Sequence, residues 1–251
     1  MQKAQALKGR VALVTGGGSG IGAAIAQAYC AAGADVVICG RRADLLEATA
    51  AGMIAAGGRA LAFAADVTSL PAMQGAVAAA LASYGRLDIV VANAGGTTGM
   101  RRAVNYTEQA WREIVDLNLN GFWNTVKAAE PALRAAGGGH VIFVGSGAKY
   151  ANAQGSAPYT AAKAGAAALC RVLAIELRQA RIAVNELIPG PVRTDAFRRL
   201  AAEDAHFEQR MVAMGEWVKE PEAVADLALY MACLPADGPT GQLFSLLGRV
   251  P

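Results

Sequence analysis

Short runs of apolar, mostly β-branched residues alternate with longer alanine-rich or amphipathic stretches along the chain. The short runs, bounded by glycine, proline or polar residues, predict strands at residues 10–15, 35–39, 59–65, 87–92, 140–145, 181–188 and 242–247. The longer stretches predict helices at residues 20–32, 43–56, 71–84, 107–136, 156–179 and 221–233. Strands separated by crossover helices are parallel. The pattern therefore predicts an α/β fold with one doubly wound parallel sheet of about seven strands and helices on both faces.

The chain of 251 residues shows no sign of division into smaller units. No stretch is rich in proline, serine or charge, and no repeat of fixed period is present. Because doubly wound sheets commonly reach this size undivided, we expect residues 1–251 to form a single domain. The longest connection, near residues 191–217, is expected to cover a substrate as a partly mobile loop at the carboxyl ends of the strands.

A glycine-rich segment follows the first expected strand directly. It comprises Gly16, Gly17, Gly18, Ser19, Gly20, Ile21 and Gly22 and leads into the helix expected at residues 20–32. Glycines permit positive φ angles and close approach of a ligand, and a helix N-terminus offers free N–H groups and a favourable dipole to an anion. A flexible hairpin is the alternative, but the strand before and the helix after favour a site for a pyrophosphate.

Tyr159 and Lys163 lie four residues apart in a segment expected to be helical, so their side chains share one face. An ammonium group beside a phenol favours the phenolate and is expected to lower the pKa of the phenol. Tyr159 is then suited to donate and accept a proton near neutral pH. An isolated pair of this kind is also common on ordinary helices, where a lysine simply lies beside a half-buried ring. Tyr150 offers a second phenol, but no lysine lies four residues beyond it.

Six short motifs support one another in order and spacing across nearly the whole chain. They are Thr15-Gly16-x-x-x-Gly20-x-Gly22, Val91-Ala92-Asn93-Ala94-Gly95, Asp116-Leu117-Asn118, Val144-Gly145-Ser146, Tyr159-x-x-x-Lys163 and Pro189-Gly190-Pro191-Val192-Arg193-Thr194. Together they resemble the short-chain dehydrogenase/reductase family. The resemblance implies a Rossmann-type fold and an oxidoreductase that interconverts a ketone or aldehyde with an alcohol by hydride transfer.

The resemblance also implies roles for individual residues. Tyr159 is the implied general acid/base, Ser146 donates a second hydrogen bond to the substrate oxygen, and Lys163 holds the nicotinamide ribose. Asn118 resembles the family's fourth catalytic residue, which interrupts a helix and holds a water linked to the lysine. The implied cofactor contacts are Gly16, Gly18, Ser19, Gly20, Ile21, Gly22, Arg41, Arg42, Asp66, Val67, Asn93, Ala94, Gly95, Tyr159, Lys163, Pro189, Gly190, Val192 and Thr194.

The end of the second expected strand indicates which cofactor is bound. An acid at this point would bind the ribose 2′-hydroxyl of NAD and repel a 2′-phosphate. Gly40 stands there instead, followed by Arg41 and Arg42, whose guanidinium groups are suited to phosphate. We therefore predict NADP(H) as the cofactor. The alternative, that the arginines only face solvent, stays open, most of all for Arg42.

The substrate is expected to be a small carbonyl compound or alcohol, but the connection near residues 191–217 does not identify it. Its apolar side chains are Phe197, Phe207, Met211, Met214 and Trp217, and its basic ones are Arg193, Arg198, Arg199 and Arg210. An apolar pocket with a basic rim would suit an anionic ketone such as an acyl thioester, whereas an amphipathic helix would place the same arginines in solvent. Further candidates for the pocket wall are Thr97, Met100, Ala148, Lys149 and Asn152.

Composition argues against several other kinds of partner. The net charge of +3 is small and no basic stripe is interleaved with aromatic residues, so nucleic acid is not an expected partner. Since no apolar stretch has the length of a membrane span and no signal peptide is apparent, we expect a cytoplasmic protein without a membrane partner. The four cysteines lie far apart, and His140 and His206 belong to no cluster with ligand spacing, so no metal site is expected.

Two points limit the resemblance. Residues 241–251 lack the acidic residue and paired glycines with which many family members end their last strand. That strand and two long helices build the family's tetramer, so we expect a homotetramer, with a dimer as the alternative.

A non-catalytic NADP(H)-binding regulatory protein would keep the glycine loop and remains an alternative function. Epimerases and dehydratases that share Tyr-x-x-x-Lys usually carry an added substrate domain, for which this chain has no room.

Overall fold

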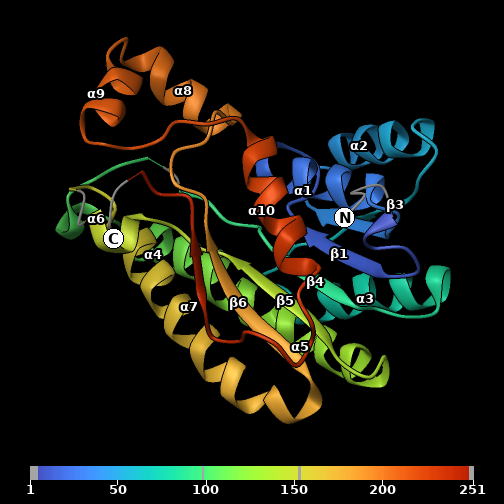
Figure 1. Ribbon diagram of the computed structural model, residues 1–251. Coiled ribbons are helices and arrows are strands. Elements are labelled where there is room, and N and C mark those ends of the chain that lie inside the picture. The colour runs from blue at the N-terminus through green and yellow to red at the C-terminus, as the bar shows by residue number, and fades with distance from the viewer. Residues whose placement is uncertain (1–4, 98, 152–153, 249–251) are drawn as a thin grey trace.

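The structure is a computed structural model that describes residues 5–97, 99–151 and 154–248. Its centre is a seven-stranded sheet of order β3-β2-β1-β4-β5-β6-β7 in which neighbouring strands are parallel (Figure 1). The strands are β1 (Val11–Thr15), β2 (Asp35–Gly40), β3 (Arg59–Ala64), β4 (Ile89–Ala92), β5 (Gly139–Val144), β6 (Ile182–Ile188) and β7 (Leu243–Ser245). The strand order runs outward from β1 in both directions, which confirms the doubly wound α/β fold expected from the sequence.

Helices cover both faces of this sheet (Figure 1). They are α1 (Gly20–Ala31), α2 (Ala43–Ala55), α3 (Leu70–Tyr84), α4 (Glu108–Val115), α5 (Gly121–Ala135), α6 (Ala148–Ala151), α7 (Ala157–Glu176), α8 (Asp195–Glu203), α9 (Phe207–Ala213) and α10 (Pro221–Ala232), with shorter turns η2 (Ala103–Asn105), η3 (Asp116–Asn120) and η4 (Arg178–Ala180). Alternate residues of a strand face opposite sides of the sheet. In β1, Ala12 and Val14 belong to the core under α1, α2 and α10, whereas Val11 and Leu13 belong to the core under α3, α5 and α7.

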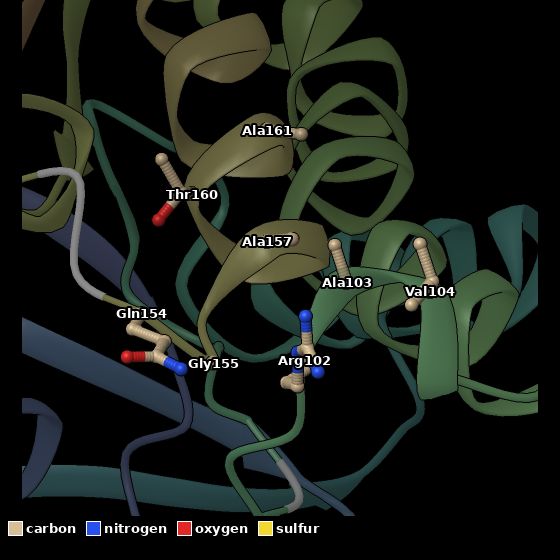
Figure 2. A pocket seen from close by; sticks show the side chains of 8 residues that line it. All are labelled: Arg102, Ala103, Val104, Gln154, Gly155, Ala157, Thr160 and Ala161. Atoms are coloured by element: carbon tan, nitrogen blue, oxygen red, sulfur yellow. The ribbon is translucent and has the colours of Figure 1, made fainter.

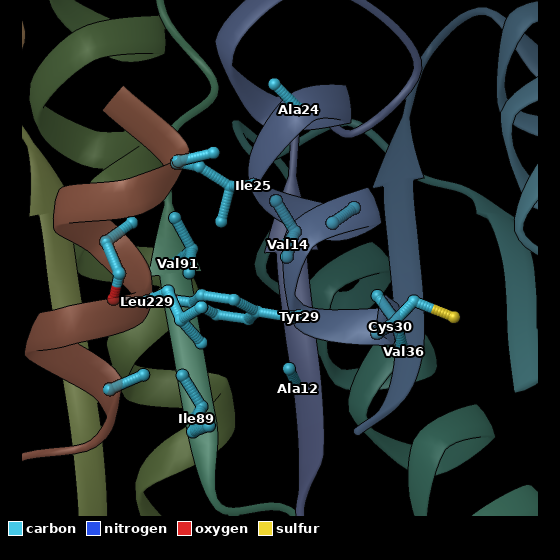
Figure 3. Close-up of a cluster of buried hydrophobic side chains, with 14 of the residues drawn as sticks. Ala12, Val14, Ala24, Ile25, Tyr29, Cys30, Val36, Ile89, Val91 and Leu229 are labelled. Atoms are coloured by element: carbon cyan, nitrogen blue, oxygen red, sulfur yellow. Dashed lines mark hydrogen bonds between the residues drawn. The ribbon is translucent and has the colours of Figure 1, made fainter. Parts of the chain in front are cut away.

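A buried tyrosine anchors the helix that follows the glycine loop. The Tyr29 ring of α1 is fully buried and packs in one cluster with Leu229 of α10 and with Ile89 and Val91 of β4 (Figure 3). Its hydroxyl donates a hydrogen bond of 2.9 Å to the carbonyl oxygen of Ala228. Burial of a side chain of this size stabilises a fold by about 2–3 kcal/mol. The ring and its hydrogen bond therefore hold α1, and the loop before it, in a fixed position.

The helix expected at residues 107–136 is divided in the structure. α4 and α5 are separated by η3, which is a π-helical turn. The Asn118 side-chain amide donates a 2.8 Å hydrogen bond to the carbonyl oxygen of Ile114, the group that the backbone N–H of residue 118 would bind in an α-helix. This competition accounts for the wider turn, and the interruption at Asn118 expected from the family resemblance is present.

The remaining expected boundaries agree with the structure to within a few residues, except near the C-terminus. The connection at residues 191–217 is not a loop throughout, because α8 and α9 occupy much of it. β7 is three residues long, shorter than the strand expected at residues 242–247, and it pairs with β6. Only a short edge strand is therefore formed by the segment that departs from the family pattern.

Candidate active site

Backbone contacts leave room only for glycine in the loop between β1 and α1. Gly16 and Gly20 have positive φ angles of 66° and 54°, a region that favours glycine. A Cβ atom on Gly22 would lie 2.3 Å from the Gly16 carbonyl oxygen, which is closer than real atoms approach. Gly22 is buried and allows the first turn of α1 to pack against the loop. It lines neither cavity of the site, so the structure gives it a packing role, and its direct contact with the cofactor stays a prediction.

Thr15 and Asn93 tie the end of β1 to the end of β4. The Thr15 hydroxyl accepts hydrogen bonds of 3.0 Å from the N–H groups of Asn93 and Ala94. The Asn93 amide donates in turn to the carbonyl oxygen of Thr15 at 2.9 Å. The strand order reverses direction between β1 and β4, so these bonds fix the crevice in which open α/β sheets bind their ligands.

Two cavities lie at this crevice and share Gly16, Arg42, Ala94 and Gly95. The larger has a volume of about 430 Å³, and its walls include Gly16, Ser19, Gly20, Ile21, Arg42, Asn93, Ala94, Gly95, Ser146, Tyr159, Lys163, Pro189, Gly190, Val192 and Thr194. The smaller, of about 180 Å³, adds Gly18, Arg41, Asp66 and Val67 from the side of β2 and β3. The structure thus brings the residues expected to contact the cofactor together around one continuous site, apart from Gly22.

Ser146, Tyr159 and Lys163 converge on the larger cavity. α7 carries the tyrosine and the lysine one turn apart, and the serine follows the end of β5. The Ser146 hydroxyl forms a hydrogen bond with the Tyr159 phenol. The Lys163 ammonium is buried, donates a 2.9 Å hydrogen bond to the Val144 carbonyl oxygen and lies 5.8 Å from the centre of the Tyr159 ring. These three side chains surround the space in which a substrate oxygen would lie.

Asn118 lies behind this cavity and not on its wall. Its side chain is buried, with Oδ1 accepting from the Gly96 N–H at 3.0 Å and Nδ2 donating to the Gly96 carbonyl oxygen at 2.7 Å. A Cβ atom on Gly95 would lie 2.8 Å from the Asn118 Oδ1 and 3.2 Å from the Lys163 Nζ. Asn118 therefore clamps the loop after β4 and approaches the lysine across Gly95, where no side chain fits.

The pKa of Tyr159 differs from the expectation. Burial raises it above the ordinary value of 10.0, and the hydrogen bond with Ser146 lowers it only in part. Burial lowers the pKa of Lys163 to about 8, while the charge of Glu186 acts in the opposite direction. The ammonium donates to the Val144 carbonyl oxygen and is not among the groups that shift the pKa of Tyr159, so the lowering expected from Lys163 is wrong for the protein alone.

Comparison with known proteins decides the family. The model of the short chain dehydrogenase family matches residues 10–205, which include the glycine loop, Asn118, Ser146, Tyr159 and Lys163. The chain belongs to the short-chain dehydrogenase family. It is therefore an oxidoreductase, and its cofactor is a nicotinamide dinucleotide.

Relatives of this dehydrogenase match it over nearly its whole length. A 7alpha-hydroxysteroid dehydrogenase from Escherichia coli strain K12 is 30% identical over 244 residues, which cover 96% of this chain and 94% of the relative. A 3-oxoacyl-(acyl-carrier-protein) reductase from Synechocystis sp. is 33% identical and 97% of each chain is covered. A solved 7α-hydroxysteroid dehydrogenase in complex with NADH and 7-oxo glycochenodeoxycholic acid is 28% identical with a TM-score of 0.92, covering 99% of this chain and 96% of that one.

The end of β2 presents two arginines to the adenosine side of the dehydrogenase site. Arg41 and Arg42 line the smaller cavity together with Gly40. The Arg42 Nη2 donates a 2.8 Å hydrogen bond to the Ser19 hydroxyl, so this guanidinium folds over the glycine loop. Arg42 is exposed to solvent and is also tied to the loop, and its contact with the cofactor stays a prediction.

Residues 191–217, which we call the cover, border the larger cavity through α8. The Arg193 guanidinium pairs with Glu208 and, at 3.1 Å, with Glu220. Arg198 lies 3.9 Å from the same Glu220 carboxylate. Arg199 differs from both, because it lines the cavity. Most of the cover's arginines therefore face acids at the surface, as in the amphipathic-helix alternative, and Arg199 is the exception.

The apolar residues of the cover fall into two groups. Phe197 is buried, and its ring packs edge-on against that of Phe207 with 5.1 Å between the ring centres, which joins α8 to α9. Met214 and Trp217 remain about half exposed, at 54% and 49%. The first group holds α8 and α9 together, and the second leaves exposed apolar surface on the cover.

Other candidates for the pocket wall lie elsewhere. Thr97, Met100, Ala148 and Lys149 line neither of the two cavities of the crevice. Met100 is exposed, whereas the Lys149 ammonium is buried in an ion pair with Glu186. Asn152 lies outside the described residues.

A separate cavity of about 570 Å³ opens at the start of α7 (Figure 2). Its walls are Arg102, Ala103, Val104, Gln154, Gly155, Ala157, Thr160 and Ala161. Although Thr160 follows Tyr159 directly, the two side chains line different cavities. This lining contains no carboxylate, imidazole or phenol, so the acid–base chemistry of the family belongs to the crevice at the strand ends.

Sequence reasoning missed three residues near the site, namely Glu186, Lys219 and Leu247. The Lys219 ammonium donates a 2.7 Å hydrogen bond to the Pro189 carbonyl oxygen. The Leu247 Cδ2 atom would lie 2.8 Å from a Cβ atom on Gly147, so the C-terminal segment packs directly beside Ser146. Only Glu186 carried a signal in the sequence, as an acid within an otherwise largely apolar strand.

The described part of the chain holds no helix that has both the length and the apolar character to cross a membrane. In the same residues, no group of three or more histidine, cysteine, aspartate or glutamate side chains is placed to hold a metal ion. His140 lies in β5, where a strand was expected, and burial lowers its pKa to about 4. It is therefore a neutral core residue at physiological pH.

Proposed function

We propose that the protein, as one domain of residues 1–251, is an NADP(H)-dependent oxidoreductase that interconverts a ketone or aldehyde with the corresponding alcohol. The observation that carries the proposal is the convergence of Ser146, Tyr159 and Lys163 on a cavity whose opposite wall is the glycine loop. A proton donor thus faces the place where a nicotinamide ring belongs in this fold.

The residues present fit a dinucleotide. α1 begins at the wall of the larger cavity, where Gly20 and Ile21 present a helix N-terminus to an anion. The smaller cavity extends the site toward Asp66, one of the cofactor contacts that the family resemblance implies. When bound, the reduced cofactor supplies the hydride that the carbonyl carbon accepts. The chain itself has to bind and orient both molecules and to handle the proton.

Tyr159 donates the proton that the substrate oxygen accepts during carbonyl reduction. Because burial raises the pKa of its phenol, the group is protonated at neutral pH and is ready to act as the acid in carbonyl reduction. Ser146 is hydrogen-bonded to this phenol and donates a second hydrogen bond to the substrate oxygen as it gains charge. Lys163 holds a positive charge beneath the ring, and Asn118 fixes the neighbouring loop.

The preference for NADP(H) is proposed from the end of β2. Gly40 places no carboxylate where it would repel a 2′-phosphate, and Arg41 and Arg42 line the cavity at this end. The bond from Arg42 to Ser19 keeps one guanidinium over the loop before any phosphate arrives. A preorganised guanidinium loses less conformational freedom on binding, which supports the assignment.

The proposed substrate is a small carbonyl compound or alcohol with an apolar body. Met214 and Trp217 give the cover exposed apolar surface, and Arg199 offers one positive charge at the wall of the cavity. The names of two relatives, a hydroxysteroid dehydrogenase and a 3-oxoacyl reductase, agree with a carbonyl compound or alcohol that carries an apolar group. No specific observation favours a non-catalytic regulatory protein.

We further propose a homotetramer, with a dimer as the alternative, that works in the cytosol. Exposed apolar side chains gather on α5 and α7, at Trp123, Val172 and Ile175, and again on α10 and β7, at Tyr230 and Leu243. Apolar groups at two separate surfaces support two kinds of subunit contact. The cysteines of the described chain are free thiols, which agrees with a reducing compartment.

The test is to follow the oxidation of NADPH and NADH, side by side, against aliphatic, aromatic, steroidal and acyl-thioester ketones. We expect turnover that prefers NADPH and selects among the ketones. Tight binding of NADPH without turnover of any ketone would contradict the catalytic proposal and favour the regulatory protein.

A further inference from the structure

An ion pair is buried beside the active site. The Lys149 ammonium of α6 lies 2.7 Å from Oε1 and 2.5 Å from Oε2 of Glu186 in β6. The two side chains are only 7% and 5% exposed. Because desolvation offsets most of the attraction between buried charges, such a pair is often no more stabilising than apolar side chains of similar volume. Its place next to the catalytic residues therefore calls for another explanation.

The pair holds the segment that carries Ser146. The Glu186 carboxylate crosses the backbone of Gly145 so closely that a Cβ atom there would lie 2.0 Å from Oε1. Ser146 follows directly, and its hydroxyl accepts a 3.1 Å hydrogen bond from the Ala148 N–H at the start of α6. Lys149 is the next residue, so the segment is fixed to β6 at both ends of Ser146.

The same carboxylate lies near Lys163. Glu186 is the register partner of Phe143 on the neighbouring strand, so both side chains point to the face of the sheet covered by α7. The Lys163 Nζ lies 4.9 Å from the centre of the Phe143 ring. The negative charge of Glu186 raises the pKa of Lys163, against the burial that lowers it to about 8.

Other charged groups around α7 act less on Lys163. Those on α7 and the elements packed against it are Glu108, Arg112 and Glu113 of α4, Asp116 of η3, Lys149 and Tyr150 of α6, Glu186 of β6, Arg178 of η4, and Tyr159, Cys170, Arg171 and Glu176 of α7. Among these described groups, Glu186 is the one whose charge shifts the pKa of Lys163.

We propose that Glu186, held by Lys149, is a positioning residue of the active site that fixes the Ser146 segment on β6 and supplies the negative charge that stabilises the Lys163 ammonium. Its effect on turnover rests on the proposed function. Its effect on Lys163 can be measured without any turnover.

Glu186→Gln removes the charge and nearly keeps the shape of the side chain. We would follow lysines labelled with ¹³C at Cε by NMR over a pH titration, with the Lys163 signal assigned from Lys163→Met. The pKa of Lys163 is expected to fall by about one unit, the usual effect of losing one nearby opposite charge. Glu130→Gln breaks the exposed pair with Arg134 on α5 and is the matched control, which should leave Lys163 unchanged.

The double variant Lys149→Met/Glu186→Leu separates positioning from simple stabilisation. Apolar side chains replace the buried pair, so we expect the melting temperature to return close to that of the original protein. If Glu186 only stabilised the fold, the double variant would restore the original pKa of Lys163 as well. Our proposal predicts that the pKa of Lys163 stays below the original value in this variant, by less than in Glu186→Gln because the Lys149 ammonium is lost together with the carboxylate.

Kinetics report the consequence for catalysis. Loss of the Lys163 proton ends activity on the alkaline side, so Glu186→Gln should move that limb of the pH profile of kcat/KM to lower pH by about one unit. At pH 6, Lys163 is protonated in both proteins. There we expect Glu186→Gln to lose about threefold in kcat with little change in the Kd of NADPH, because the Ser146 segment is no longer held on β6.

The proposal is overturned if the pKa of Lys163 in both Glu186→Gln and the double variant stays within about 0.2 units of the original value. A protein that reduces no ketone at all would overturn the proposed function alone. The NMR titration would then still decide the role of Glu186.

Discussion

The glycine-lined crevice and the cover meet at one cavity but are held in different ways. In the crevice, atoms of Gly16, Gly22 and Asn93 approach so closely that an added Cβ would lie 2.3–2.8 Å from a neighbour. In the cover, α8 and α9 are joined by an aromatic contact, and Arg193, which precedes α8, forms ion pairs at the surface with Glu208 of α9 and with Glu220. Surface ion pairs are individually weak. The cofactor side is thus fixed by backbone packing, and the substrate side is free to vary and to move.

Because the crevice and the cover are held in different ways, they differ in how narrowly they define the ligand that each can bind. Backbone geometry that admits only glycine limits the ligand to one chemical class, a dinucleotide. Loosely held side chains such as Met214 and Trp217 accept many apolar shapes. The reaction class is therefore easier to infer than the substrate, and variants of the two regions should behave differently.

Gly22→Ala would break the crevice and have the largest effect on it. Its Cβ atom would overlap the Gly16 carbonyl oxygen, so the loop has to move away from the pyrophosphate position. We expect the Kd of NADPH, measured by fluorescence titration, to rise about 100-fold, the equivalent of ~3 kcal/mol of overpacking.

Gly52→Ala is the matched control for that change. Gly52 lies in α2 and has open space around its Cβ position, so alanine should stabilise the helix by about 1 kcal/mol and leave the Kd unchanged. Equal effects of the two substitutions on cofactor binding would contradict the steric account of the crevice.

Gly40→Asp tests whether the crevice selects the cofactor through charge. A Cβ atom at Gly40 meets only ordinary contacts, 3.8 Å from Leu46 and 3.9 Å from Gly16, so the aspartate fits. It should repel a 2′-phosphate and bind a ribose hydroxyl, which lowers the ratio of kcat/KM for NADPH over NADH about 30-fold. Gly52→Asp adds the same charge away from the site and should leave the ratio unchanged. A ratio that does not fall with Gly40→Asp would contradict the proposal that the missing carboxylate at residue 40 favours NADPH.

Arg193→Ala loosens the cover and should have a smaller effect. The contacts with Glu208 and Glu220 are lost, but both lie at the surface. We expect the KM of the ketone to rise up to about fivefold and the Kd of NADPH to stay within about twofold. Hydrogen exchange of α8 and α9 should become faster. Arg134→Ala is the matched control, because it breaks an exposed ion pair on α5 and should leave the KM, the Kd and this exchange unchanged. Slower cofactor binding with unchanged exchange would show that the cover is not the separate, weakly held region described here.

Much of the fold could be predicted because local patterns determine it. The short, mostly apolar run Val11–Thr15 and the glycine loop after it are visible in the sequence, and the structure shows a strand buried throughout, followed by that loop. The shared face of Tyr159 and Lys163 follows from helical periodicity alone. These features depend on residues close together in the chain.

The features that could not be predicted depend on packing between distant segments. Lys149 and Glu186 are 37 residues apart, and no spacing rule connects α6 to β6. The pKa of Tyr159 depends on a balance between burial and the hydrogen bond with Ser146 that only the folded environment sets. In the same way, Leu247 reaches Gly147 because the C-terminal segment returns to the site, in the region where the sequence departs from the family pattern.

The most direct test of the central claim is to compare Tyr159→Phe with the original protein in two assays, ketone reduction by NADPH and the Kd of NADPH. Tyr84→Phe, at the end of α3 and away from the crevice, is the matched control. The account predicts that Tyr159→Phe lowers kcat by about 10³-fold, since the proton donor is lost, and keeps the Kd within about threefold. Turnover retained by Tyr159→Phe at the original rate would contradict the proposed role of the phenol as the general acid.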